Sequence, residues 1–306
     1  MENYIKSLLI FTIVICVFSV TAQKKKDWDK INMGKEYGID FTKFKSVSKS
    51  LKNSPSIIAD YKIQQFFEQK GNNHKGGGAT MFSTVGLSGI SQEAYQKTIN
   101  ELYANLFEEL KNIGLEMADG EKVVNSAAAQ SMHDGKKNIS EVHSGRLADG
   151  KIDGAGKYAI YRPIAPQYYT NKKIYGTYYL KLAKKEDVNM FMVSYTITFA
   201  GFDASRGKSS KYLSTGPYMT VRLDMSINTP KGSYSIISFK KQPIEANNDW
   251  SLGINKDDEK DGSFWGISSS YDYTLKADED KFLTELSSII KGMQKAIAEE
   301  MKNELK

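Results

Sequence analysis

Apolar and polar residues alternate with a period of two in two segments of the second half of the chain. In Met190–Phe202 the apolar side chains alternate with serine and threonine, and Met219–Ile227 alternates as strictly. This period places the two kinds of side chain on opposite faces of a pleated strand, so both segments are predicted β-strands. A turn is predicted at Asn228–Gly232, after which Tyr234–Phe239 pairs back as a hairpin.

Two longer segments have helical periodicity instead. Ser91 is a candidate N-cap, apolar residues then recur every three or four positions as far as Leu110, and Gly114 is the expected C-terminal stop. A second helix is predicted from Asp278 to about Leu305. Its apolar stripe consists of Phe282, Leu286, Ile289, Met293, Ile297 and Met301.

Weaker patterns cover the rest of the chain. Ser56–Gln69 is rich in β-branched and aromatic residues and predicts a strand, whereas Gly71–Gly89 has six glycines and predicts a long flexible loop. The polar segment His133–Lys157 predicts a second loop. The remaining predictions are a short strand at Leu115–Met117, helices over Glu121–Met132 and Asn171–Lys185, a strand at Tyr158–Tyr161 entering a turn at Pro163 and Pro166, and one or two strands within Trp250–Leu275.

The order of these elements predicts the fold class. Helices and strands alternate early in the chain, and antiparallel strands dominate later. This order is typical of an α+β fold with a mixed, largely antiparallel sheet, packed helices and a long C-terminal amphipathic helix. We expect one globular domain over residues 56–306, preceded by a basic arm at 23–55.

Residues 1–22 are predicted to be a signal peptide. Lys6 precedes the apolar run Leu8–Val20, which is shorter than the about 20 residues that span a bilayer, and small residues lead up to Ala22. Cleavage near Ala22 would remove Cys16, the one cysteine of the chain. Ile15 stands where lipoprotein processing requires a small residue, so lipidation is not expected. The predicted location is therefore extracytoplasmic, periplasmic or secreted, as for a bacterial envelope protein.

Most of the net charge of +6 lies in the basic arm. Residues 23–55 contain nine lysines and four acids, so the body is nearly neutral and a nucleic-acid surface on it is not expected. Asp40 is a candidate N-cap for a short amphipathic helix. Packing of this helix on the domain is the favoured interpretation, and contact with an anionic surface is the alternative. The apolar stripe of this helix consists of Phe41, Phe44, Val47 and Leu51.

The order of elements also resembles a known envelope domain. The succession of strand, glycine-rich loop, long helix, Gly114-Leu115-Glu116-Met117 and alanine-rich helix resembles one half of it. Tyr178–Ile197, a helix that runs through Leu182-Ala183 and Asp187-Val188 into an apolar strand, resembles the other half. That domain occurs in the curli-secretion protein CsgG, in the lipoprotein activators of penicillin-binding proteins and at the N-terminus of TolB. The resemblance covers about Ser56–Phe239 and implies an α/β domain that binds other proteins and has no catalytic residues.

Motifs that could hold a ligand depart from their templates. Gly201–Ser209 resembles a phosphate-binding loop but has five residues between its glycines instead of four. Asp257–Gly262 matches the start of a calcium loop, but Ser268 stands at position 12, where a glutamate is required, so calcium binding is left open. Ser88 lacks the surroundings of a nucleophile elbow. No zinc template fits the three histidines, His74, His133 and His143.

Aromatic residues leave one further interpretation open. Seven tyrosines within 22 residues favour packing, and sugar stacking is the alternative. They are Tyr158, Tyr161, Tyr168, Tyr169, Tyr175, Tyr178 and Tyr179. From the residues and the resemblance together, no catalytic, cofactor-binding or metal-binding residue is predicted.

Three functions follow from these observations. The leading hypothesis is a non-enzymatic protein that binds an envelope protein partner in cell-envelope assembly or maintenance, through Gly71–Gly89 and Lys24–Lys52. The first alternative is a secreted hydrolase of polysaccharide or peptidoglycan, which requires carboxylates about 5–10 Å apart in a cleft. The second is an oligomeric outer-membrane pore component, in which several copies together supply the at least eight strands of a pore.

Overall fold

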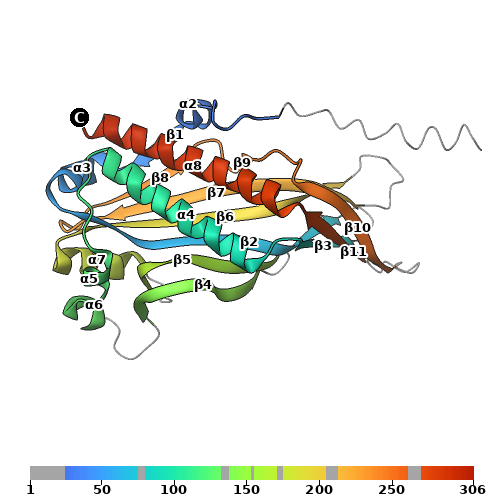
Figure 1. Cartoon of the computed structure of the whole chain (residues 1–306), viewed down its shortest axis with the longest axis horizontal. Coiled ribbons are helices and arrows are strands. Elements are labelled where there is room, and N and C mark those ends of the chain that lie inside the picture. Colours follow the sequence, from blue (N-terminus) through green and yellow to red (C-terminus); the bar gives the residue numbers. More distant parts are fainter. Residues whose placement is uncertain are drawn as a thin grey trace, which may run out of the picture.

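The chain folds around one mixed sheet that carries two long helices on one face (Figure 1). This computed structural model describes residues 25–74, 80–131, 138–152, 155–170, 175–204, 213–260 and 270–306. The main path of the sheet has the order β1-β8-β7-β6-β2-β3-β11-β10, and β5, with β4 beyond it, joins at β2. The α+β prediction is confirmed, and the predicted signal peptide lies outside the described residues.

The strands and helices have the following bounds. The strands are β1 (Ile39–Thr42), β2 (Ser56–His74), β3 (Thr80–Ser88), β4 (Asn138–Ile152), β5 (Gly156–Thr170), β6 (Asn189–Ala204), β7 (Leu213–Asn228), β8 (Tyr234–Phe239), β9 (Ile244–Glu245), β10 (Ser251–Lys260) and β11 (Ser270–Ala277). The helices are α2 (Met33–Tyr37), α3 (Phe44–Asn53), α4 (Gln92–Asn112), α5 (Gly120–Val124), α6 (Ala127–Ser131), α7 (Tyr175–Glu186) and α8 (Glu279–Glu304).

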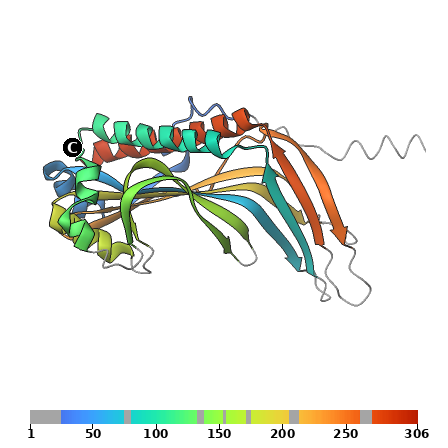
Figure 2. The ribbon, with the colours of Figure 1, turned by 60° about the horizontal axis from the view of Figure 1, so that its bottom comes forward.

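The long helices α4 and α8 lie side by side because the strands before them do. β3 pairs with β11 in parallel, and each strand leads directly into its helix, so both helices start at the same end of the sheet (Figures 1 and 2). Both predicted caps are confirmed: the Ser91 hydroxyl accepts a bond from the amide of Ala94, and the Asp278 carboxylate accepts one from the amide of Lys281. The hydrogen bond that the Lys281 amide donates is the main reason why the pKa of Asp278 lies below its usual value.

The period of two divides the sheet between core and solvent. On β6, Val193, Tyr195 and Ile197 are buried beneath the helices, and the alternating Ser194 and Thr196 on the other face are half-buried. The six predicted stripe residues of α8 are all buried. One face of the sheet is thus closed by α4 and α8, and the other is open between α7 and the bent ends of β2, β3, β10 and β11 (Figure 2).

The predicted loop at Gly71–Gly89 is wrong. Residues 71–74 end β2 and residues 80–88 form β3, the two strands pair with each other as an antiparallel hairpin, and residues 75–79 lie outside the described part. The glycine of this segment that lies in β2 has a packing reason: a Cβ atom on Gly71 would collide with the ring of Phe202. Here glycine makes room for an aromatic side chain within a strand.

The predicted loop at His133–Lys157 is wrong as well. Residues 138–152 form β4 and Gly156 begins β5, with residues 132–137 and 153–154 outside the described part. Among the described strands β4 pairs with β5 alone, so it is an outer strand. A strand at a sheet edge tolerates polar residues and glycine, and its sequence therefore lacks the apolar alternation that would have revealed it.

β5 also passes through the predicted turn at Pro163 and Pro166. Its pairing with β2 ends where Tyr161 faces Ile63, and the later residues pair with β4. Proline, which has no N–H to donate, is tolerated where one side of a strand is unpaired. The predicted helix Glu121–Met132 is divided into α5 and α6, with Met132 outside the described part.

The predicted arm helix begins later than expected. Asp40 lies in β1, which pairs with β8, and α3 starts at Phe44 after Lys43 in a left-handed conformation. Phe44, Val47 and Leu51 belong to the same core as α4 and α8, which confirms the packing interpretation.

A pair of glycines tests how closely the ends of β3 and β11 fit. Gly89 and Gly114 have almost the same φ, +89° and +91°, but a Cβ on Gly89 would collide with the carbonyl oxygen of Ala277, whereas one on Gly114 has open space. Gly114→Ala is expected to lower the free energy of unfolding by about 1 kcal/mol, because alanine is strained at this positive φ. Gly89→Ala should lower the free energy of unfolding, measured with urea, by at least about 1 kcal/mol more, because its Cβ atom also collides with the Ala277 carbonyl oxygen. Equal losses in the two variants would contradict the close approach.

Candidate functional site

The open face of the sheet contains a trough of about 580 Å³, here named the sheet trough. Its walls are α7 on one side and β8 on the other, and strands β2, β6 and β7 form its floor. Much of its lining is apolar. The apolar side chains are those of Tyr179, Leu180, Met192, Tyr234 and Ile236.

Strand register determines which side chains meet in the sheet trough. Ile236 faces Ser226, Ser226 faces Met192, and Met192 faces Asp60, so one row crosses four strands. All members of such a row point to the same side of a sheet. The core residues beneath α4 and α8 point to the opposite side, and the buried residues on the side of the trough, such as Met190, pack against α7. This row lies beside that second cluster and lines the trough.

One wall of the trough presents large apolar surface to water. Tyr234 is 43% exposed and Ile236 is 46% exposed. The Lys43 ammonium lies 4.4 Å from the centre of the Tyr234 ring and donates a 2.8 Å bond to its hydroxyl. The cation therefore holds the Tyr234 ring in place at the rim.

A buried ion pair lies at the opposite end of the row. The guanidinium of Arg162, on β5, is 3.0 Å from the Asp60 carboxylate, and both side chains are only 7% exposed. The hydroxyl of Tyr179 donates a 3.3 Å bond to the second carboxylate oxygen. This network connects β2, β5 and α7, and it fixes the wall that α7 supplies to the trough.

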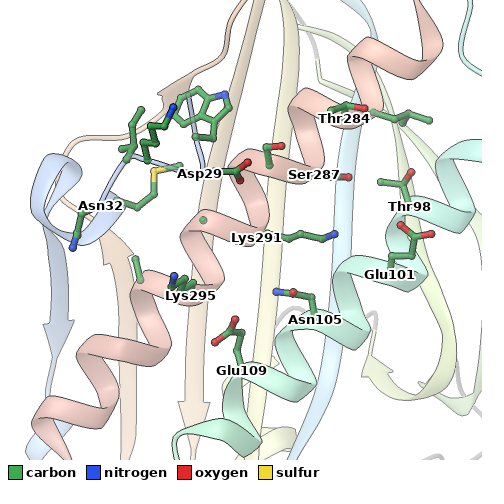
Figure 3. A pocket seen from close by; sticks show the side chains of 18 of the residues that line it. Asp29, Asn32, Thr98, Glu101, Asn105, Glu109, Thr284, Ser287, Lys291 and Lys295 are labelled. Atoms are coloured by element: carbon green, nitrogen blue, oxygen red, sulfur yellow. The ribbon is translucent and has the colours of Figure 1, made fainter. Parts of the chain in front are cut away.

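A second hollow, the helix groove, lies over the outer face of α8 and has a volume of about 920 Å³. It extends to α4 on one side and to residues 28–33 on the other, and Lys291 and Asn105 point into the space between the helices (Figure 3). Its floor has small side chains, and its walls alternate in charge. The charged residues from the two helices are Lys97, Glu101, Glu109, Asp280, Lys291, Lys295 and Glu299.

The lining of the helix groove is more polar than apolar. Glu101 and Glu109 are eight residues apart on α4, hence about 12 Å along the axis, which exceeds the separation of a glycosidase pair. At the edge of the groove, a bond between Lys30 and Asp27 raises the pKa of Lys30 and lowers that of Asp27. The hydrolase alternative stays a prediction.

A buried carboxylate fastens the N-terminal segment to α8 beside this groove. Glu285 accepts bonds from the Trp28 indole (2.6 Å), the Asn247 backbone amide (2.7 Å) and the Asn247 side chain (3.1 Å). Asn247 in turn bonds both backbone groups of Lys26. We call this set, Lys26, Trp28, Asn247 and Glu285, the N-terminal clamp.

The fold does not gather the described histidines and Ser88 into one metal or catalytic site. His74 ends β2 and His143 lies on β4, two strands that do not pair, and His133 lies outside the described residues. Ser88 is exposed at the end of β3. Among the residues that the structure describes, no group of three His, Cys, Asp or Glu could hold a metal ion.

The two loop motifs are only partly described. Residues 257–260 of the calcium-like motif belong to β10, and residues 201–204 of the phosphate-loop-like motif belong to β6. The later residues of both lie outside the described part.

The tyrosines that the structure describes serve largely for packing. Tyr179 and Tyr161 are buried, and Tyr158 and Tyr178 are half-buried. The side chains of Tyr168, Tyr169 and Tyr175 lie outside the described part.

The residues of the sheet trough were not singled out from sequence. Alternation in Met190–Phe202 already places Met192 opposite Val193, but it does not tell which of the two faces the helices cover. Asp60 and Arg162 are more than 100 residues apart, and no local pattern connects them.

Comparison of the chain with protein-family models, with curated proteins and with solved structures gave no match. The resemblance to the CsgG and TolB envelope domain therefore stays a prediction. Over the described ranges, no helix combines the length and apolar character needed to cross a membrane.

Proposed function

We propose that the protein acts by binding a partner protein of the cell envelope at the sheet trough, without catalysis. The observation that carries this proposal is the apolar trough on the open face of the sheet, with Tyr234 and Ile236 exposed at its rim. Apolar patches of this kind, bordered by polar groups, are typical of interaction sites. The envelope location rests on the predicted signal peptide.

The lining of the trough suits an apolar segment of a partner. Its polar side chains lie between apolar ones, and both of its carboxylates form ion pairs. The buried Asp60 pairs with Arg162, and the exposed Asp224 pairs with Arg222 on the same strand. A partner side chain that enters the trough thus meets little uncompensated charge. It releases water from Met192 and Ile236, which is the main favourable contribution to such binding.

Ile236→Glu is expected to weaken binding of the partner at least about 10-fold, because burying an isoleucine contributes roughly 1.5–3 kcal/mol and a carboxylate there stays hydrated. The partner is first identified by a photo-crosslinking residue at position 236 in cells. Its affinity for the purified wild type and variant is then measured by titration calorimetry.

Ile164 supplies the matched control. It is 58% exposed, on β5, and does not line the sheet trough. The same crosslinker at position 164 should capture a different set of proteins, and Ile164→Glu should leave the affinity unchanged. If both positions capture the same proteins, or if both variants bind equally well, the trough is not the binding site.

A further inference from the structure

Six lysines from three segments of the chain gather at one end of the molecule, here named the basic end. Three lie on α3, two at the end of α7 and one in the turn between β7 and β8. They are Lys45, Lys49, Lys52, Lys184, Lys185 and Lys231. Three of the six belong to the predicted basic arm, and the fold adds the other three.

Contacts between the segments establish that they adjoin. The side-chain amide of Asn189, three residues after α7, donates bonds to the carbonyls of Ser50 (3.2 Å) and Ser54 (2.7 Å) at the end of α3. A Cβ atom on Gly232, in the β7–β8 turn, would lie 3.0 Å from the Lys184 ammonium. α3 and α7 also lie at the same end of the molecule in both views (Figures 1 and 2).

The six ammonium groups face water without a carboxylate partner in the described part of the chain. All six residues are exposed, and none forms an ion pair there. Some lysines elsewhere on the surface do have an acidic partner, such as Lys111 with Glu108 and Lys157 with Glu68. Glu186 and Asp187 are the only acids within the three segments, so the basic end keeps an excess of positive charge.

The shape of the basic end points to a broad partner. None of the six lysines lines the sheet trough or the helix groove. On α3 the lysines recur at the spacing of one helix face, opposite the buried Phe44, Val47 and Leu51. All six cations are lysine, whose ammonium is a point charge and can meet mobile phosphates without the fixed geometry that the fork of arginine requires.

We infer that the basic end docks on a bilayer surface rich in anionic phospholipid headgroups. Each lysine near such a surface contributes roughly a five-fold gain in membrane partition at physiological salt. The attraction is electrostatic, so it falls as salt is added. This inference does not rest on the function proposed for the sheet trough.

The test is co-sedimentation of the full chain with vesicles of phosphatidylcholine, with and without phosphatidylglycerol. The variant K49Q/K52Q/K184Q/K185Q is expected to lose more than about 100-fold in binding to the anionic vesicles. The control K97Q/K276Q/K291Q/K295Q removes the same charge from exposed positions on α4, β11 and α8, away from the basic end, and it should bind like the wild type. Circular dichroism melting verifies that both variants are folded.

The two variants share the same N-terminal segment, so any binding that this segment contributes is equal in both. Anionic-lipid-dependent binding that is lost only in the basic-end variant supports the inference. The inference would be overturned if the wild type bound neutral vesicles as tightly as anionic vesicles, or bound neither. It would also be overturned if binding to anionic vesicles fell equally in both variants. Capture of nucleic acid or an acidic protein by the basic end, with no vesicle binding, would overturn it too.

Discussion

Arg162→Met is expected to lower the free energy of unfolding by about 3–5 kcal/mol, because it leaves the Asp60 carboxylate buried without its cation. The two side chains are each 7% exposed and lie 3.0 Å apart, so little water can replace the lost partner. The Tyr179 hydroxyl remains as a donor to Asp60, but it carries no charge. Urea unfolding followed by circular dichroism measures the loss.

A double variant separates the ion pair from ordinary packing. Asp60→Leu with Arg162→Met removes both charges, and it should recover much of the stability, because a well-packed apolar pair often replaces a buried ion pair with little change. If the double variant is as unstable as Arg162→Met alone, loss of packing and not the stranded carboxylate would explain the effect.

Glu285→Leu is expected to lower the free energy of unfolding by about 3 kcal/mol or more, because it leaves three buried N–H donors of the N-terminal clamp without their acceptor. Each such donor costs roughly 1–3 kcal/mol, and relaxation of the short N-terminal segment reduces the sum. The measurement is urea unfolding, combined with hydrogen exchange of residues 25–37. Exchange should rise there more than in α4.

Trp28→Phe is the graded control for the clamp. It removes one donor and keeps an aromatic ring, so it should cost about 1 kcal/mol. Glu285→Gln keeps an acceptor for the Trp28 indole, so its loss of stability should lie between those of Trp28→Phe and Glu285→Leu. Losses that are equal in all three variants would show that the hydrogen bonds of Glu285 do not hold the segment.

The two proposed surfaces share an element. α7 contributes Tyr179 and Leu180 to the sheet trough and Lys184 and Lys185 to the basic end. If both proposals hold, a protein docked on a membrane through the basic end would meet its partner close to the bilayer.

Elements with a regular period were predictable. α4 and α8 were expected within a few residues of their bounds and with the correct caps, Ser91 and Asp278. The β7–β8 hairpin was also expected. Each of these elements buries one face, and burial of one face requires the periodic apolar pattern that a sequence displays.

Elements that lie at an edge or pair unusually were missed. The sequences of β3 and β4 contain glycine and polar residues, and their strand character shows only in their pairing with neighbouring strands. The sequence of β1 predicts the start of a helix, since Asp40 and Phe41 fit a cap and a stripe as well as they fit a strand. A short segment has too few periods to separate the two.

The sequence alone determined the fold class, the two long helices, the central hairpin and the concentration of charge near the N-terminus. Only the tertiary structure decided which face of the sheet stays open, which strands bring Asp60 to Arg162, and which lysines join those of α3. Periodicity is a local property that reports how much of a segment is buried. Partners are set by strand order and register over more than 100 residues, which no local pattern encodes.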